Sequence, residues 1–112
     1  MSENNGSPSG GMKAAARRAL KWHEEGKRGG TVVGLTRARQ IVAGENLSAS
    51  TIKRMFSFFS RHEVDKKATG FNQGEEGYPS PGRVAWDLWG GDSGFAWSRK
   101  KVNQINDNKS TE

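Results

Sequence analysis

The sequence predicts an all-α fold, a small bundle of four to five short helices with a long loop and disordered termini. Apolar residues recur at helical spacing, capping residues precede these stretches, and glycines follow them. With 112 residues and a hydrophobic share of 32%, the chain has room for one domain with a small core. We assign residues 12–105 to this single helical domain. We assign residues 1–11 and 106–112 to disordered tails, because they are polar and offer no core anchor.

The first predicted helix runs from Met12 to about Glu25, where the sequence is rich in alanine and other strong helix formers. Its inner side is an apolar stripe that consists of Met12, Ala15, Ala16, Ala19, Leu20 and His23. Its outer side is a basic ridge that consists of Lys13, Arg17, Arg18 and Lys21. The glycine-rich connection from Gly26 to Thr31 adds Lys27 and Arg28. These cations either contact phosphates or form an ordinary solvated surface.

The second predicted helix begins near Gly34 and ends at Gly44, a residue suited to the left-handed conformation that terminates many helices. Its inward positions are Leu35, Ala38 and either Ile41 or Val42. Its outward positions are Arg37 and Arg39. Its pattern therefore combines one packed face with one cationic face.

The third predicted helix has a well-defined start at Ser48, whose hydroxyl can accept a hydrogen bond from the first turn. Leu47 before this cap and Ile52 inside the helix can form a hydrophobic staple. The apolar stripe consists of Ile52, Met55, Phe56 and Phe59. The cations Lys53, Arg54 and Arg61 point away from that stripe. The second and third helices together form the centre around which the chain is organised.

A long loop is predicted after the third helix. The charged segment from Glu63 to Ala68 finishes that helix. The segment from Thr69 to Gly82 is rich in glycine and contains two isolated aromatic residues, Phe71 and Tyr78. We expect a surface loop that these two side chains pin to the domain.

Two more helices are predicted in the C-terminal half. Ser80 caps the first of them and Pro81 takes its first position, where the missing N–H is tolerated. A glycine pair then breaks the chain, and a last helix capped by Asp92 or Ser93 runs from about Gly94 to Ile105. Because large aliphatic residues are few, tryptophans are expected to fill the core, with base stacking as the alternative. These tryptophans are Trp86, Trp89 and Trp97.

Basic residues are concentrated in the N-terminal half. The net charge is +6, but the stretch from Lys13 to Arg61 contains 11 basic and 3 acidic residues. From His62 onward there are 7 basic and 8 acidic residues. A cationic lobe on a small domain is typical of a protein that binds a polyanion. The alternative is a solvated surface that favours solubility.

The sequence offers no pattern for catalysis or metal binding. Cysteine is absent, and His23 and His62 do not stand at metal-ligand spacing. The basic glycine-rich connection lacks the spacing of a nucleotide P-loop. The string from Gly91 to Gly94, GDSG, occurs around serine-protease nucleophiles, but here it lies between two predicted helices. We expect no metal, no cofactor and no enzymatic activity.

The sequence also offers no pattern for a membrane protein. The first residues show no signal pattern, and no apolar run approaches the roughly 20 residues that span a bilayer. We expect a soluble intracellular protein with no membrane partner.

Two strings, GENLSASTIKRMFSFFSRHEVDKKATGF and GYPSPGRVAWDLWGGDSGFAW, resemble a family of small basic proteins of tailed bacteriophages, particularly those of cyanobacteria. The family is mostly uncharacterised, and a similar segment appears beside phage head proteins. The resemblance covers roughly Ala15 to Lys101. It implies a phage origin, action in the host cytoplasm or the virion, and DNA, capsid or a host protein as partner. It carries over no catalytic or binding residue.

Residues 34–62 also show a looser resemblance to a helix-turn-helix, although the connection from Gly44 to Leu47 is about two residues longer than usual. This resemblance implies that the start of the third helix faces bases, through Ala49, Ser50, Lys53 and Arg54. It also implies phosphate contacts from Arg37, Arg39 and the basic ridge of the first helix.

The sequence therefore predicts a non-enzymatic phage protein that binds nucleic acid, with duplex DNA favoured, through its basic N-terminal helical half. The alternative is a virion or head-assembly module whose cationic surface meets an acidic host or capsid protein. The predicted nucleic-acid-binding residues are Arg17, Arg18, Lys21, Lys27, Arg28, Arg37, Arg39, Ser50, Lys53, Arg54 and Arg61.

Overall fold

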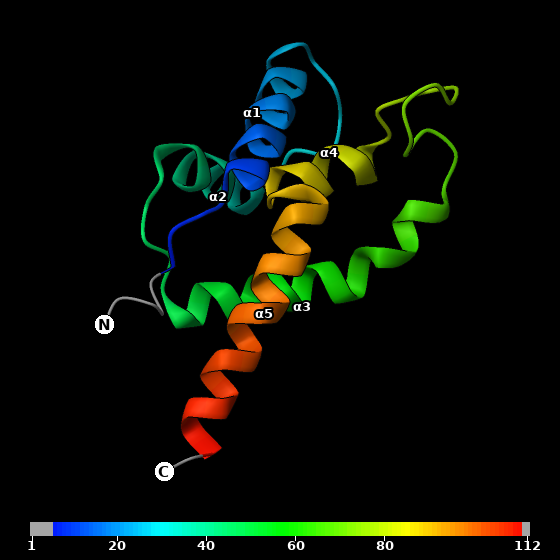
Figure 1. Cartoon of the computed structure of the whole chain (residues 1–112). Coiled ribbons are helices and arrows are strands. Elements are labelled where there is room, and N and C mark those ends of the chain that lie inside the picture. The colour runs from blue at the N-terminus through cyan, green and yellow to red at the C-terminus, as the bar shows by residue number, and fades with distance from the viewer. Residues whose placement is uncertain (1–5, 111–112) are drawn as a thin grey trace.

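Five α-helices and one short 3-10 helix make up the computed structural model, which describes the backbone of residues 6–110 and side chains as far as Asn106 (Figure 1). The α-helices are α1 (Gly10–Glu24), α2 (Val32–Ala43), α3 (Ala49–His62), α4 (Pro81–Leu88) and α5 (Gly91–Ser110). The 3-10 helix η2 (Glu63–Lys67) follows α3 directly. Residues 6–110 contain no β-strand. The predicted all-α class is confirmed.

The helices pack in two groups that share α4 and α5. α1 packs against α2 and α4, whereas α3 packs mainly against α5. α5 also contacts α1, and its C-terminal half extends past α3 in Figure 1. Consecutive helices α2 and α3 therefore have different main partners, α1 for α2 and α5 for α3, although both also contact α4. This arrangement differs from a helix-turn-helix, in which the two helices form one supersecondary unit around a short turn.

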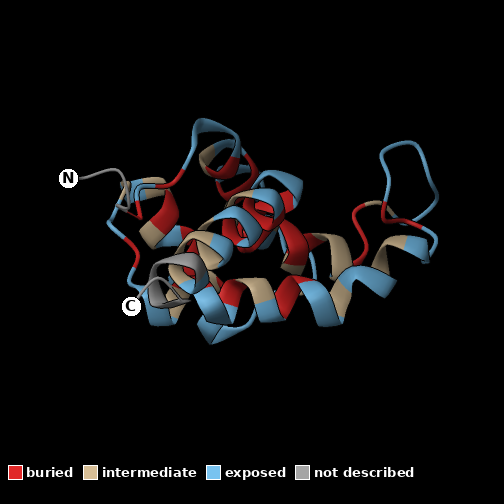
Figure 2. Ribbon diagram, turned by 60° about the horizontal axis from the view of Figure 1, so that its bottom comes forward, coloured by how far each residue is buried: buried red, intermediate tan, exposed pale blue. Residues whose placement is uncertain are grey.

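Aromatic side chains fill much of the core, as expected from the shortage of large aliphatic residues. Trp86 is 1% exposed, and Phe59 meets its edge with ring centroids 4.8 Å apart. Phe59 also stacks on Phe95 at 5.2 Å, which joins α3 to α5. Trp89 is buried as well, while Trp97 is only partly buried against the core. Figure 2 shows the buried positions on the inward sides of the helices.

The buried face of α3 is shifted from the predicted stripe. Ile52, Met55 and Phe59 are buried as predicted, but Phe56 is only partly buried. Phe58 is buried in its place, because it stacks on Trp89 at the end of α4 with ring centroids 4.5 Å apart. The position of α4 beside α3 therefore decides which phenylalanine is covered.

Local signals placed three helix boundaries correctly. The Ser48 hydroxyl accepts from Thr51 N–H at 3.2 Å, and the Ser80 hydroxyl accepts from Arg83 N–H at 3.1 Å. Gly44 follows α2 with φ of 75°, in the left-handed region where a side chain would be strained. Each signal depends only on residues within one turn of the boundary.

The N-terminal boundary differs from the predicted one. α1 begins at Gly10 rather than Met12, because the Ser9 side chain caps it by accepting from Met12 N–H. Gly6 is buried and its carbonyl accepts from Leu47 N–H at 3.0 Å. Residues 6–11 are thus part of the domain, although their composition predicted disorder. The rest of that predicted tail, residues 1–5, lies outside the described residues.

The C-terminal helix is longer than predicted at both ends. α5 begins at Gly91, so Asp92 and Ser93 lie in its first turn and do not cap it. The Gly94 N–H donates to the Gly90 carbonyl at 2.9 Å, which continues the chain from α4 with only a short turn. The helix extends to Ser110, into the segment predicted to be disordered, while residues 111–112 lie outside the described range.

The long loop between η2 and α4 is pinned at the two predicted aromatic residues. Phe71 is 2% exposed and packs in the core. Tyr78 meets Trp22 of α1 edge to face, with ring centroids 5.4 Å apart. Trp22 thus packs inward, whereas His23, which was assigned to the stripe of α1, is exposed. The docked loop sets the side of α1 that is covered.

Candidate functional site

The predicted nucleic-acid-binding residues lie on α1, α2, α3 and the connection after α1. Every one of them except Arg37 is exposed. The exposed members are Arg17, Arg18, Lys21, Lys27, Arg28, Arg39, Ser50, Lys53, Arg54 and Arg61. Their side chains are therefore available to a partner.

Most cations of the N-terminal half have no carboxylate partner. Across the described side chains, the ion pairs are Arg18–Asp87, Arg83–Asp87 and Lys66–Asp92, and His62 Nδ1 lies 3.3 Å from Asp65 Oδ2. Of the 11 basic residues from Lys13 to Arg61, Arg18 is the member that takes part. The carboxylates of the C-terminal half mainly neutralise cations of their own half.

Arg37 is not an outward-facing cation, and this prediction is wrong. The residue is 7% exposed, and its guanidinium lies 5.3 Å from the ring centroid of Trp89. A Cβ on Gly34 would lie 3.3 Å from Leu88 Cδ1, tighter than an ordinary contact, so the glycine lets α2 approach the end of α4 closely. Arg37, one turn later on α2, consequently covers the indole and does not reach into solvent.

A polar cleft of about 310 Å³ lies between α1, α4 and the start of α5. Small residues, among them Gly11, Ala15 and Gly90, leave room for it. The charged residues that line it are Arg18, Lys66, Arg83, Asp87 and Asp92. They come from α1, η2, α4 and α5, so the fold brings distant segments together here.

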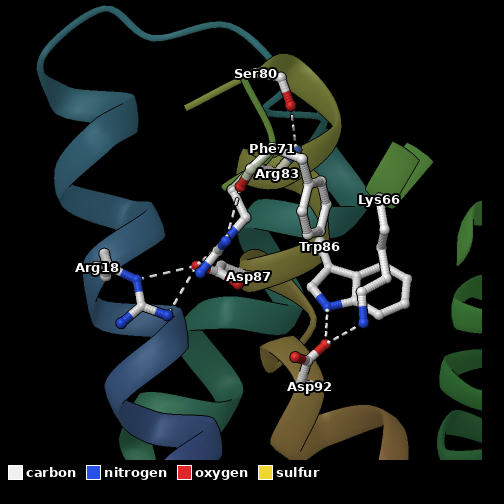
Figure 3. Close-up of polar contacts among 8 residues, drawn as sticks. All are labelled: Arg18, Lys66, Phe71, Ser80, Arg83, Trp86, Asp87 and Asp92. Atoms are coloured by element: carbon white, nitrogen blue, oxygen red, sulfur yellow. Dashed lines mark hydrogen bonds and ion pairs between the residues drawn. The ribbon is translucent and has the colours of Figure 1, made fainter. Parts of the chain in front are cut away.

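Asp87 is the centre of this cleft (Figure 3). Its side chain is 1% exposed, and its Oδ2 accepts from Arg18 Nε at 3.0 Å and from Arg83 Nε at 3.1 Å. Arg83 Nη1 also donates to the Phe71 carbonyl at 2.8 Å. The carboxylate thus joins α1 to α4, and Arg83 joins both to the long loop.

Asp92 forms a second group on the other side of the cleft (Figure 3). Its Oδ1 accepts from Lys66 Nζ at 3.0 Å and from Trp86 Nε1 at 2.9 Å. Lys66 Nζ also lies 5.2 Å from the Trp86 ring centroid, a favourable position for a cation. The start of α5 is thereby tied to η2 and α4.

The two carboxylates have opposite pKa shifts. Burial raises the pKa of Asp87, and the charges of Arg83 and Arg18 oppose this effect. For Asp92, whose side chain is largely exposed, partial desolvation acts in the same upward direction, but the hydrogen bonds from Lys66 and Trp86 and the charges of Lys66 and Arg83 together lower the pKa. Both acids are engaged by cations, so the cleft is built as an ion-pair network.

Only part of this network is visible in the sequence. The Arg83–Asp87 pair is at i, i+4 on one helix, which is a recognisable signal. Asp87 also stands between Trp86 and Leu88, in a stretch where a charged residue needs a partner. Arg18, however, is 69 residues away from Asp87, and no local pattern predicts that contact.

Within the described residues, no three His, Cys, Asp or Glu side chains gather in a way that could hold a metal ion. Over the same part of the chain, no helix has the length and apolar character needed to cross a membrane.

Comparison with family models, curated proteins and solved structures found no match for this chain. The fold and the ion pairs define a small all-α domain in which the cations of the N-terminal half, Arg18 apart, have no carboxylate partner among the described side chains.

Proposed function

We propose that this protein binds nucleic acid, with duplex DNA as the favoured ligand, through the unpaired cations of its N-terminal half. The observation that carries the proposal is that ten of the 11 basic residues between Lys13 and Arg61 have no carboxylate partner among the described side chains. Each cation that neutralises a phosphate releases condensed counterions, which favours binding at low salt. The proposed role involves no enzymatic step.

The proposal concerns the phosphate backbone and assigns no base contact. Because α2 and α3 do not pack as one unit, Lys53 and Arg54 are treated as phosphate contacts like the other exposed cations. The resemblance to phage proteins supports the host cytoplasm or the virion as the place of action.

The test is a DNA titration of a multiple variant by fluorescence anisotropy. Replacing Arg17, Lys21, Arg39 and Lys53 with Ala removes four exposed, unpaired cations from three helices. Titrations at about 50 mM and about 200 mM salt should show that each residue in contact with a phosphate contributes about one unit to the salt slope. The loss of affinity should be the same for every duplex sequence.

The matched control replaces Arg99 and Lys100, which are exposed cations in the near-neutral half. This variant should retain the salt slope and affinity of the wild type. Absence of wild-type binding to duplex or single-stranded nucleic acid at low salt would reject the proposal. An acidic host or capsid protein would then be the partner to test, as in a head-assembly module.

A further inference from the structure

The polar cleft between α1, α4 and the start of α5 has the size of a small-molecule site. Its volume of about 310 Å³ lies at the lower end of the range for ligand pockets, roughly 300 to 1,000 Å³. The side chains of Arg18 and Lys66 on its walls are 44% and 36% exposed, so solvent reaches them. Trp86 and Phe71 also line it and are almost fully buried, which gives the cleft a fixed base. A small molecule can therefore reach the charged groups that line the cleft.

Three cations that line the cleft keep hydrogen-bond donors from which no described group accepts. Arg18 uses Nε and Nη2 on Asp87, which leaves Nη1 free. Arg83 uses Nε on the same carboxylate and Nη1 on a loop carbonyl, which leaves Nη2 free. Lys66 makes one hydrogen bond, to Asp92, although an ammonium group has three N–H donors. The cleft therefore has unused donors on both of its sides.

The charges that line the cleft do not cancel. Arg18, Lys66 and Arg83 give three positive charges, whereas Asp87 and Asp92 give two negative charges. Both guanidiniums donate to the same oxygen, Asp87 Oδ2, so they are neighbours and that oxygen is already occupied. Two adjacent guanidiniums with free N–H groups are donors suited to carboxylate and phosphate oxygens. One bound anionic group would balance the surplus positive charge.

The three cations are also held in place before any ligand binds. Each is joined to a carboxylate, and each lies over an aromatic ring. These cation–ring pairs are Arg18 with Trp22 at 5.7 Å, Arg83 with Phe71 at 5.1 Å and Lys66 with Trp86 at 5.2 Å. Because fewer side chains have to be ordered on binding, less conformational entropy is lost. This distinguishes the cleft from the exposed, unpaired cations of α1, α2 and α3.

We propose that the cleft binds a small molecule that carries a carboxylate or phosphate group. The oxyanion accepts from the free N–H groups of Arg18 and Arg83, and Lys66 faces it from the other side of the cleft. The Ser93 hydroxyl also lines the cleft and is a further donor without a partner among the described residues. The inference goes beyond the proposed function, because Arg18 is the one residue that the cleft shares with the predicted nucleic-acid-binding set.

The test measures binding of inorganic phosphate and of acetate to the full chain by calorimetry and thermal melting, with sodium chloride at equal ionic strength as the reference. We expect saturable binding and a higher melting temperature with at least one of the two probes. Stronger binding of phosphate indicates a phosphorylated ligand, and stronger binding of acetate indicates a carboxylic acid.

Arg18→Gln removes one of the two adjacent guanidiniums and should weaken probe binding at least about tenfold. Lys67→Gln is the matched control, because Lys67 is an exposed cation next to Lys66 that does not line the cleft. This control should bind the probes like the wild type.

Ser93 allows a second test at an exposed position that leaves every ion pair of the cleft in place. Ser93→Asp adds a carboxylate that repels the probe, whereas Ser93→Asn adds a neutral side chain of nearly equal size. The Asp variant should bind the probe at least about tenfold more weakly than the Asn variant. If Arg18→Gln does not fold, this pair decides alone.

The variant that lacks Arg17, Lys21, Arg39 and Lys53 separates the cleft from the proposed function, because none of these residues lines the cleft. It should lose DNA affinity and still bind the probe. Loss of probe binding in this variant would assign the effect to the exposed cations and overturn the inference. Equal wild-type melting temperatures in phosphate, acetate and chloride would overturn it too, as would equal probe affinities for Ser93→Asp and Ser93→Asn. Probe binding without any DNA binding rejects the proposed function and leaves the site standing.

Discussion

Arg83 connects three parts of the molecule through one side chain. Its Nε pairs with Asp87 on the same helix, and its Nη1 donates to the Phe71 carbonyl at the base of the long loop. Its guanidinium also lies 5.6 Å from the ring centroid of Tyr78, farther along that loop. Since a buried carboxylate without a partner is strongly unfavourable, Arg83 stabilises both α4 and the loop.

Replacing Arg83 with Met should lower the free energy of unfolding by about 3 kcal/mol near neutral pH, because Asp87 and the Phe71 carbonyl lose a donor. Burial already raises the pKa of Asp87 above its unfolded value, and loss of the guanidinium raises it further. When the pKa of a carboxyl is higher in the folded than in the unfolded protein, the free energy of unfolding is highest at a pH below the unfolded-state pKa. It falls as the pH rises through the folded-state pKa. The variant should therefore lose less stability at about pH 4 than at about pH 7.

Urea unfolding of the wild type and Arg83→Met at the two pH values measures this difference. Arg99→Met serves as the control, because Arg99 is exposed and forms no ion pair within the described side chains. An equal loss at both pH values would show that the loss does not come from ionised Asp87, which keeps Arg18 as its remaining partner.

At the scale of the element, α3 contributes two phenylalanines with different surroundings. Phe59 is 0% exposed and contacts both Trp86 and Phe95. Phe56 lies at the margin of the same helix face, partly buried, with its ring centroid 6.1 Å from that of Phe95. The core therefore depends mainly on Phe59.

Phe59→Ala should cost about 3 to 5 kcal/mol, because it opens a cavity among well-packed rings. Phe56→Ala should cost less, about 2 kcal/mol, since part of its side chain remains in solvent in the folded protein. Chemical denaturation of both variants gives the two free energies. Equal losses in the free energy of unfolding for the two variants would mean that Phe56 is as deeply buried as Phe59, as helical spacing alone predicts.

Helix boundaries were predictable where the signal is local. Ser48, Ser80 and Gly44 act within one turn of the helix that they cap, so their roles are visible in the sequence. The choice between Phe56 and Phe58 was not predictable, because it depends on Trp89 from another helix. The early start of α1 depends on a local cap, Ser9, but the place of Gly6 in the domain was not predictable, because its carbonyl accepts from Leu47 N–H far along the chain.

The candidate site was predictable only in its exposed part. Helical spacing placed Arg17 and Arg39 on the surface correctly, but it also placed Arg37 there, and Trp89 covers that residue. Spacing also cannot show which cations are neutralised. The pairing of Arg18 with Asp87 depends on the packing of α1 against α4.

At the scale of the whole molecule, charge and its compensation are distributed unequally. The C-terminal half is close to neutral and contains the acidic partner of every ion pair among the described side chains. The N-terminal half carries a surplus of basic residues that is left almost entirely unpaired. Mutual repulsion among these cations should destabilise the folded protein when screening is weak.

The melting temperature should therefore rise when sodium chloride is increased from about 10 mM to about 150 mM, as the Debye length falls from about 30 Å to about 8 Å. Thermal melts followed by circular dichroism measure the effect. The variant that lacks Arg17, Lys21, Arg39 and Lys53 should show a smaller dependence on salt. A melting temperature that falls with salt would show that attractive ion pairs outweigh the repulsion.

A backbone contact at Gly6 closes the first half of the chain into a ring through hydrogen bonds. Its carbonyl accepts from Leu47 N–H, its own N–H donates to Asn46 Oδ1, and a Cβ on it would lie 2.1 Å from the Leu47 carbonyl oxygen. α1 and α2 are thus enclosed between two points of the backbone that touch. A chain trimmed to begin at Met12 would open this ring and leave the buried Leu47 without its acceptor. The folded unit therefore begins no later than Gly6, at a position that has no room for a side chain.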